Sequence, residues 1–235
     1  MKIDIYSGIN ELSQSAASLF IEVAQKAIAD RGRFLVALSG GSTPMKLYER
    51  LAGNKLDWTS VHFFWGDERC VPADDPGNSY GQTKQVLFDK IGDTNIHRIN
   101  SDLAPDSAAT DYTRTLKAFS EPPLDFPRFD LVLLGMGDDG HTASLFPGSP
   151  VEVDSPALAV TANYQDRPAN RVTLTQTVFN QAREIWFLVA GANKAETLQK
   201  VLKGEFQPKV FPAQRIKPVN GNLVWMIDEE AASLL

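Results

Sequence analysis

The sequence has 235 residues, the size of one large domain or two small ones. Hydrophobic residues make up 43% of the chain and charged residues 22%, so a sizeable core can form and wholesale disorder is excluded. The 23 lysines and arginines are outnumbered by 29 acidic residues, and this net charge of −6 argues against a nucleic-acid partner. An anionic small molecule would therefore need cationic side chains gathered at one place.

Two further features concern the compartment. The longest apolar stretches, such as 34–38 and 131–134, are far shorter than the roughly 20 residues that span a bilayer, so we expect no membrane partner. Asp4 stands where a secretory signal would continue its apolar run. Cys70 is the single cysteine and cannot close an internal disulfide, which is typical of a reducing compartment. We expect a cytoplasmic protein.

Periodicity predicts the elements in chain order. Apolar residues recur at helical spacing from Leu12 to Ile28, ahead of Gly32, which predicts a helix capped by Asn10. Short apolar runs then predict strands covered on both faces, at 34–38, 61–65, 131–134 and 185–189. Helical patterns lie between or after them, most clearly at 78–90, 107–119 and 194–203.

The alternation of strands and helices predicts an α/β fold of Rossmann type, with a mostly parallel sheet and helices on both faces. Proline gathers at 121–127 and 146–156, but neither stretch has the length or low complexity of a flexible linker. We therefore expect residues 1–235 to form a single domain.

Ligands of open parallel sheets bind at the carboxyl ends of the strands, so the loops after the four strands are the places to search. In the first loop, Gly40 and Gly41 allow close backbone approach, while Ser42 and Thr43 offer hydroxyls for helix capping and anion binding. With the N-terminus of the following helix, these residues predict a phosphate cradle. The alternative is a tight strand-to-helix turn without a ligand. The Gly-Lys-Ser/Thr ending of an ATP-type loop is absent.

The second loop carries charge. Asp67, Glu68 and Arg69 follow the second strand, and the guanidinium of Arg69 can bind a phosphate or face negative charge that develops in acyl chemistry. We expect both carboxylates to line the same pocket. The alternative is a solvated charge cluster. Cys70 is interpreted as a buried cysteine rather than a nucleophile.

The third loop matches a dinucleotide fingerprint, with Gly135, Gly137 and Gly140 in the pattern G-x-G-x-x-G. Two features oppose a nicotinamide cofactor. Asp138 and Asp139 would face the negative pyrophosphate, and prolines at 147 and 150 leave too little room for the crossover helix. We therefore reject the dinucleotide interpretation.

His141 ends the same loop. A histidine takes and returns a proton near neutral pH, and a carboxylate such as that of Asp139 can fix its tautomer, so the pair is a candidate acid/base. The alternative is a histidine that caps the following turn. His62 and His97 lie in or beside predicted strands and are interpreted as packing residues, and no two histidines stand at the spacing of metal ligands.

The fourth loop places Lys194 at the start of a helix, where the helix dipole disfavours a cation, so its presence points to an anion in front of it. Arg171, which opens the segment 171–175, is a further candidate cation. Together the loops predict a phosphorylated small molecule held near a histidine.

These motifs resemble the 6-phosphogluconolactonase family in order and spacing over almost the whole chain. The most specific of them is Gly-His-Thr-Ala-Ser-Leu-Phe-Pro at 140–147, and the least specific is the Gly-Gly-Ser loop. The resemblance implies the fold of sugar-phosphate deaminases and isomerases, and hydrolysis of 6-phospho-D-glucono-1,5-lactone to 6-phospho-D-gluconate without a metal or cofactor. It also implies that His141 is the acid/base and that Arg69 binds substrate and stabilises charge. The phosphate-handling set would be Gly41, Ser42, Thr43, Arg171 and Lys194.

Two alternative functions are considered: a glucosamine-6-phosphate deaminase or related aldose–ketose isomerase of the same fold and, from a different class, a non-catalytic sugar-phosphate sensor. Glucosamine-6-phosphate deaminases carry a glutamate five residues after the histidine, where this chain has Phe146, and Asp-Glu-Tyr where it has Asp67-Glu68-Arg69. A non-catalytic sugar-phosphate sensor would not need an acid/base histidine, and the chain has no spare residues for a DNA-binding segment. The two residues that depart from the deaminase pattern, Phe146 and Arg69, favour a lactonase.

Overall fold

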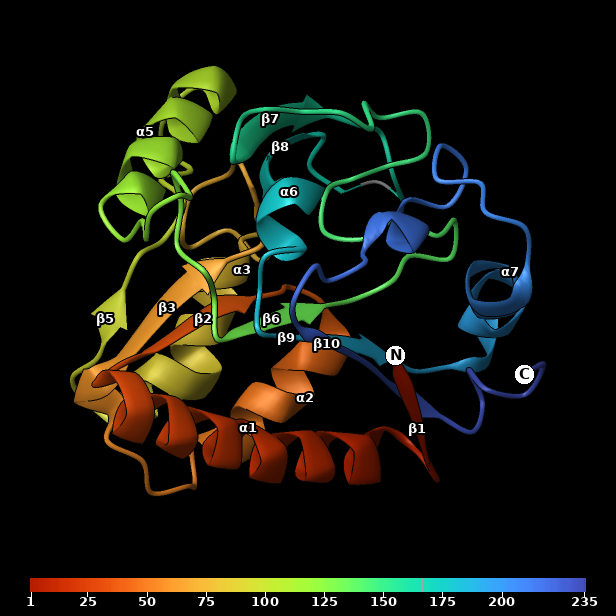
Figure 1. Cartoon of the computed structure of the whole chain (residues 1–235), viewed down its shortest axis with the longest axis horizontal. Helices are drawn as coiled ribbons and strands as arrows, with labels where there is room; N and C mark the ends of the chain where they lie inside the picture. The colour runs from red at the N-terminus through yellow and green to blue at the C-terminus, as the bar shows by residue number, and fades with distance from the viewer. Residues whose placement is uncertain (166) are drawn as a thin grey trace.

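Two β-sheets organise the chain in the computed structural model, which describes residues 1–165 and 167–235 (Figure 1). Within these residues the larger sheet has seven parallel strands in the order β1-β10-β9-β6-β2-β3-β5. The smaller sheet has three antiparallel strands in the order β4-β8-β7. The predicted α/β fold with a mostly parallel sheet is confirmed.

The strands of the larger sheet are β1 (Lys2–Tyr6), β2 (Phe34–Leu38), β3 (Val61–Trp65), β5 (Asn95–Ile96), β6 (Leu131–Leu134), β9 (Glu184–Val189) and β10 (Asn222–Asp228). Those of the smaller sheet are β4 (Asp67–Arg69), β7 (Ala157–Thr161) and β8 (Asn170–Leu174). The α-helices are α1 (Ile9–Arg31), α2 (Ser42–Leu51), α3 (Ser79–Thr83), α4 (Asp89–Ile91), α5 (Pro105–Lys117), α6 (Gln176–Phe179) and α7 (Ala195–Lys203). Other short helical turns are η1 (Trp58–Ser60), η2 (Lys84–Phe88), η3 (Ala192–Lys194) and η4 (Pro212–Arg215).

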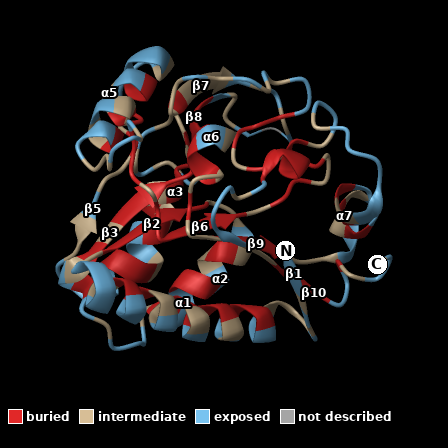
Figure 2. Cartoon of the chain, in the orientation of Figure 1, coloured by how far each residue is buried: buried red, intermediate tan, exposed pale blue. Residues whose placement is uncertain are grey.

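Helices cover both faces of the larger sheet. In Figure 1, α1 and α2 lie on one side of it, and α5, α6 and the smaller sheet lie on the other. The central strands β2 and β6 are buried at every position, which explains their uninterrupted apolar sequences (Figure 2). The core therefore follows the middle of this sheet. Among the residues described, no helix is both long and apolar enough to cross a membrane.

The predicted cap of the first helix is wrong. Helix α1 begins at Ile9, directly after Gly8, so Asn10 already lies in its first turn. The N-terminal polar contact comes from Glu11 instead, because its carboxylate accepts hydrogen bonds from the backbone N–H of Ser7 at 2.8 Å and from its hydroxyl at 2.7 Å. Both donors belong to Ser7, so this contact fastens the residue before Gly8 to the first turn and is not a capping box, in which the two residues exchange hydrogen bonds.

A short connection after β3 joins the two sheets. The N–H of Gly66 donates to the carbonyl of Leu38 at the end of β2, at 2.7 Å, while its own carbonyl accepts from the N–H of Leu174 in β8, at 2.8 Å. Strand β4 starts at the next residue. The smaller sheet therefore stands directly beside the carboxyl ends of β2 and β3, where it forms one wall of a pocket.

Candidate active site

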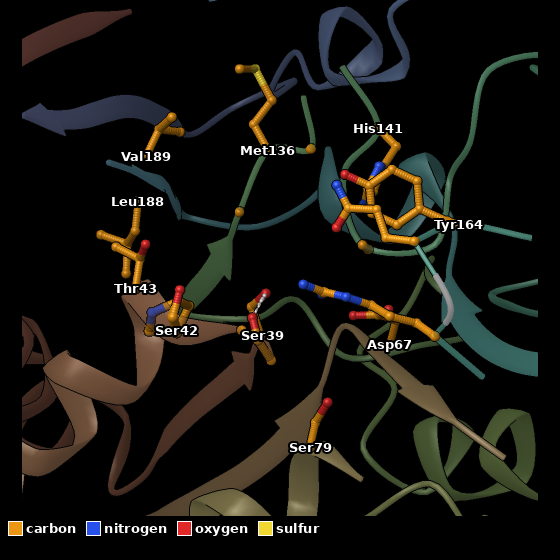
Figure 3. Close-up of a pocket in the computed structure, with 18 of the residues that line it drawn as sticks. Ser39, Ser42, Thr43, Asp67, Ser79, Met136, His141, Tyr164, Leu188 and Val189 are labelled. Atoms are coloured by element: carbon orange, nitrogen blue, oxygen red, sulfur yellow. Dashed lines mark hydrogen bonds between the residues drawn. The ribbon is translucent and has the colours of Figure 1, made fainter. Parts of the chain in front are cut away.

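The loops after β2, β3, β6 and β9 meet in one pocket, as expected for the carboxyl edge of a parallel sheet (Figure 3). Most of the predicted site residues line it, and these are Gly40, Gly41, Ser42, Thr43, Asp67, Arg69, His141, Arg171 and Lys194. Asp139 and Glu68 do not line it, and each has a different place in the structure.

Asp139 lies behind the imidazole of His141. Its Oδ1 is 2.6 Å from His141 Nδ1 and also accepts the backbone N–H of His141 at 3.0 Å. Burial opposes the charge on Asp139, but the hydrogen bonds from His141 outweigh burial and hold the pKa of this carboxyl below its ordinary value. Because an ionised Asp139 can only accept a hydrogen bond, Nδ1 carries the hydrogen and donates it to Oδ1, which leaves Nε2 as the basic nitrogen. Among the described residues, Nε2 has no hydrogen-bond partner.

Gly137 makes room for this pair. A Cβ atom at position 137 would lie 2.1 Å from His141 Nδ1 and 2.6 Å from Asp139 Oδ1. Real Cβ atoms essentially never approach other heavy atoms so closely. The glycine is therefore required by the neighbouring imidazole, which accounts for part of the dinucleotide-like spacing without a dinucleotide.

The other two carboxylates near the loop have partners of their own. Asp67 Oδ2 accepts the hydroxyl of Ser144 at 2.6 Å. Asp138 accepts hydrogen bonds from the side chains of Tyr164 and Gln165, the latter at 2.9 Å. Of the carboxylates of Asp67, Asp138 and Asp139, only that of Asp139 forms a hydrogen bond with His141 among the described residues.

The prediction that Glu68 lines the pocket is wrong. Its side chain points away because alternate residues of a strand face opposite sides, and Asp67 and Arg69 occupy the pocket side of β4. Glu68 is 1% exposed and accepts three backbone N–H groups at 2.8 Å, from Arg69, Ser79 and Tyr80. Burial raises its pKa to about 7 in spite of these bonds. Glu68 therefore ties β4 to the start of α3.

Two arginines form the cationic wall. Arg69 of β4 and Arg171 of β8 are directly opposite each other in the antiparallel register. Arg69 Nη1 donates to the carbonyl of Gly77 at 2.7 Å, and Arg171 Nε donates to that of Pro168 at 3.1 Å. Neither forms a salt bridge within the part of the chain that the structure describes. Like charges in directly opposed positions destabilise a sheet, so an anion bound between the two guanidinium groups would reduce their repulsion.

Arg171 is the more buried of the two, with 2% of its surface exposed, and its Nη2 has no hydrogen-bond partner among the residues described. Burial lowers the pKa of this guanidinium, and the charge of Arg69 lowers it further. An unpaired, buried guanidinium nitrogen is costly, which points to an anionic ligand at this position.

The N-terminus of α2 adds backbone donors. The expected hydroxyl cap from Ser42 or Thr43 is wrong, because Gly41 is the N-cap and no side chain caps the helix. Gly41 has φ +102°, a conformation that favours glycine. The first N–H groups of α2 therefore stay available beside the pocket. Lys194 lines the same pocket and is half-buried; burial lowers the pKa of its ammonium group, while the charges of Asp138 and Asp139 oppose that effect.

Sequence reasoning missed the turn between β7 and β8. Tyr164, Gln165 and Arg167 of this turn line the pocket, and Tyr164 is drawn beside His141 in Figure 3. They were not predicted because they follow none of the four core strands whose loops were considered. The two strands of this hairpin are joined by eight residues, 162–169, a connection longer than the loops of two to five residues by which a sequence signals a hairpin.

The geometry agrees with comparisons to known proteins. Residues 8–225 match the model of a family described as glucosamine-6-phosphate isomerases/6-phosphogluconolactonase. A 6-phosphogluconolactonase of Synechocystis is 42% identical over 214 residues, which cover 89% of this chain and 88% of the relative. The structure of 6-phosphogluconolactonase from Trypanosoma brucei superposes with a TM-score of 0.86 at 28% identity, covering 100% of this chain and 98% of that one. A monomeric glucosamine-6-phosphate deaminase also has a TM-score of 0.86, but at 24% identity it shows the shared fold alone.

Proposed function

The chain belongs to the family of glucosamine-6-phosphate isomerases and 6-phosphogluconolactonases, and we infer that it hydrolyses 6-phospho-D-glucono-1,5-lactone to 6-phospho-D-gluconate in the pentose phosphate pathway. One observation carries this inference. A histidine held by a carboxylate shares its pocket with a buried arginine, Arg171, whose Nη2 has no hydrogen-bond partner among the described residues. The first group suits proton transfer and the second suits a phosphorylated substrate.

The proposed chemistry begins with water. Nε2 of His141 removes a proton from a water molecule as the oxygen attacks the lactone carbonyl, and Asp139 stabilises the imidazolium that forms. Arg69 faces the negative charge that develops on the carbonyl oxygen. The tetrahedral intermediate then collapses, the bond from the former carbonyl carbon to the ring oxygen breaks, and His141 returns the proton to that oxygen. General acid/base assistance of this kind typically contributes about 10²–10⁴-fold.

The phosphate of the substrate would lie at the other end of the pocket. Arg171 and Lys194 supply positive charge. The loop of Gly40 and Gly41 and the N-terminus of α2 supply backbone N–H groups, and Ser42 and Thr43 add hydroxyls. Binding energy from this remote group would hold the lactone carbon near His141.

The residue at position 146 tells against the isomerase alternative. The Phe146 ring lies 4.5 Å from the His141 ring, centroid to centroid, so an apolar side chain stands beside the histidine where the deaminase pattern has a glutamate. A pure sensor is equally disfavoured, because a binding site has no use for an imidazole oriented by a carboxylate.

The proposal includes a cytoplasmic location, supported by the lone cysteine, and one domain over residues 1–235, supported by the direct hydrogen bonds between the two sheets at Gly66. Its partner is the phosphorylated lactone. The net charge of −6 argues against nucleic acid.

The deciding experiment is a coupled assay. Freshly prepared lactone is offered with 6-phosphogluconate dehydrogenase, and the rate is corrected for spontaneous ring opening. We expect rapid hydrolysis by the wild type and a loss of about 10²–10⁴-fold in kcat for His141→Ala, with folding and 6-phosphogluconate binding retained. Near wild-type turnover in that variant would remove the histidine from the mechanism. Ammonia release from glucosamine 6-phosphate, measured in parallel, would instead support the deaminase.

A further inference from the structure

The turn between β7 and β8 is fastened to the loop that carries the histidine. Tyr164 and Gln165 are consecutive residues of this turn, and their side chains donate to the two carboxylate oxygens of Asp138, the first to Oδ1 and the second to Oδ2. Both oxygens of Asp138 are thus held by one turn.

Asp138 is also fixed from the opposite side. Its backbone carbonyl accepts the hydroxyl of Thr197, in α7, at 2.6 Å. The next residue is Asp139, which holds His141 through Nδ1. The loop segment that orients the imidazole is therefore anchored between the β7–β8 turn and α7.

Tyr164 also touches the imidazole itself. The rings of Tyr164 and His141, which lie beside each other in Figure 3, meet edge to face, with centroids 4.7 Å apart and planes at 80°. The ring of Phe146 packs against His141 with a centroid distance of 4.5 Å. His141 thus has an aromatic ring from each of two separate segments beside it. Such contacts restrict the tilt of the imidazole, which its hydrogen bond to Asp139 does not fix alone.

The charges of the pair suit this bond. The hydrogen bond from Tyr164 holds the pKa of Asp138 below its ordinary value, and burial together with Asp138 raises the pKa of Tyr164. At neutral pH the phenol is protonated and the carboxylate is ionised. This is the arrangement of a charge-assisted hydrogen bond, which is stronger than a neutral one.

We propose that Tyr164 is a positioning residue for the hydrolysis: through its hydrogen bond to Asp138 and its edge contact with His141, it holds the imidazole in the orientation needed for proton transfer. The inference rests on the proposed function, and assigns Tyr164 no contact with the reacting atoms. It predicts an effect on kcat rather than on substrate binding, because the phosphate-binding groups lie on other elements.

The test uses Tyr164→Phe, which keeps the ring and removes the hydroxyl. We expect kcat to fall about tenfold, with KM changed less than about twofold, since a hydrogen bond to a charged group is worth roughly one to two factors of ten. Tyr6→Phe, which removes a hydroxyl from β1, is the matched control and should leave kcat unchanged. Thermal unfolding of each variant checks that the fold is retained.

A double-mutant cycle separates positioning from general stabilisation. Asp138→Ala should lower kcat to a similar extent, Asp138→Asn should lower it less because its amide oxygen still accepts from Tyr164, and the double variant Tyr164→Phe/Asp138→Ala should be no worse than the poorer single variant. Additive losses in kcat, or an unchanged kcat in Tyr164→Phe, would overturn the proposal. An inactive wild type would instead refute the proposed function, so the two failures are distinguishable.

Discussion

At the scale of single residues, the site depends on the absence of a side chain at Gly137. The imidazole of His141 and the carboxylate of Asp139 occupy the space where a side chain at 137 would stand. Orientation of the base is therefore set by backbone shape as much as by hydrogen bonding. The same glycine made the loop look like a nucleotide-binding motif in the sequence.

This close approach gives a direct prediction. Gly137→Ala should lower kcat at least about tenfold, because its Cβ must displace either the imidazole or the carboxylate that orients it. Gly135→Ala is the matched control from the same loop, since its Cβ would meet nothing within 4 Å, and its activity should fall far less. The coupled lactone assay measures both variants. Equal activities in the two would contradict the steric argument.

How far the sequence predicted the site depends on the residue. His141 and Arg69 were found because they end loops that follow core strands. Glu68 was misplaced because three charged residues in a row do not reveal which of them face the pocket until the strand β4 is known. Tyr164 was missed because its importance comes from a contact across 26 residues of sequence, with Asp138.

At the scale of elements, burial decided which strands could be recognised. β2 and β6 are buried at every position, and their apolar runs gave their bounds directly. β1 forms one edge of the larger sheet, with three of its five residues exposed, so polar residues interrupt its pattern. The smaller sheet was not predicted for a similar reason, since β4 has only three residues and all of them are charged.

A pair of histidines joins two of these elements. His62 of β3 and His97, just beyond β5, lie with Nδ1 and Nε2 3.1 Å apart, and their rings are stacked. Burial and the neighbouring His62 lower the pKa of His97 to about 4, and burial lowers that of His62. Two neutral rings share one hydrogen, whereas two protonated rings would place two donors face to face.

The pair predicts a loss of stability in mild acid. An unfolded histidine has a pKa near 6.5, so between about pH 6.5 and pH 4 the unfolded chain binds more protons than the folded one, and the free energy of unfolding falls as the pH falls. The contribution of His97 is at most about 1.4 kcal/mol per pH unit. His97→Phe keeps an aromatic ring and removes this group, so urea unfolding across that range should show a smaller slope than the wild type. Equal slopes would show that the pair does not titrate in this way.

At the scale of the whole molecule, the unpaired cations link ligand binding to stability. Arg69 and Arg171 face each other across β4 and β8, and among the described residues no carboxylate forms a salt bridge with either. The protein should therefore be more stable when an anion occupies the pocket. For a ligand at a hundred times its Kd, the gain would be about 2.7 kcal/mol.

Thermal unfolding with 6-phosphogluconate tests this linkage. The wild-type Tm should rise with ligand concentration, and Arg171→Gln should show a much smaller rise, because the buried guanidinium is replaced by a neutral amide. Arg114→Gln alters an exposed arginine of α5 and serves as the control, with a rise like that of the wild type. A wild-type Tm that does not respond to the ligand would refute the linkage.

The pairing of β1 has a consequence for how the chain is made. Residues 2–6 pair with residues 224–228, and in the described chain β10 is the only neighbour of β1. The ribosome releases the first of these segments more than two hundred residues before the second. The first strand therefore stays without its native partner while the more than two hundred residues up to β10 are made, and the larger sheet can be completed only when β10 emerges.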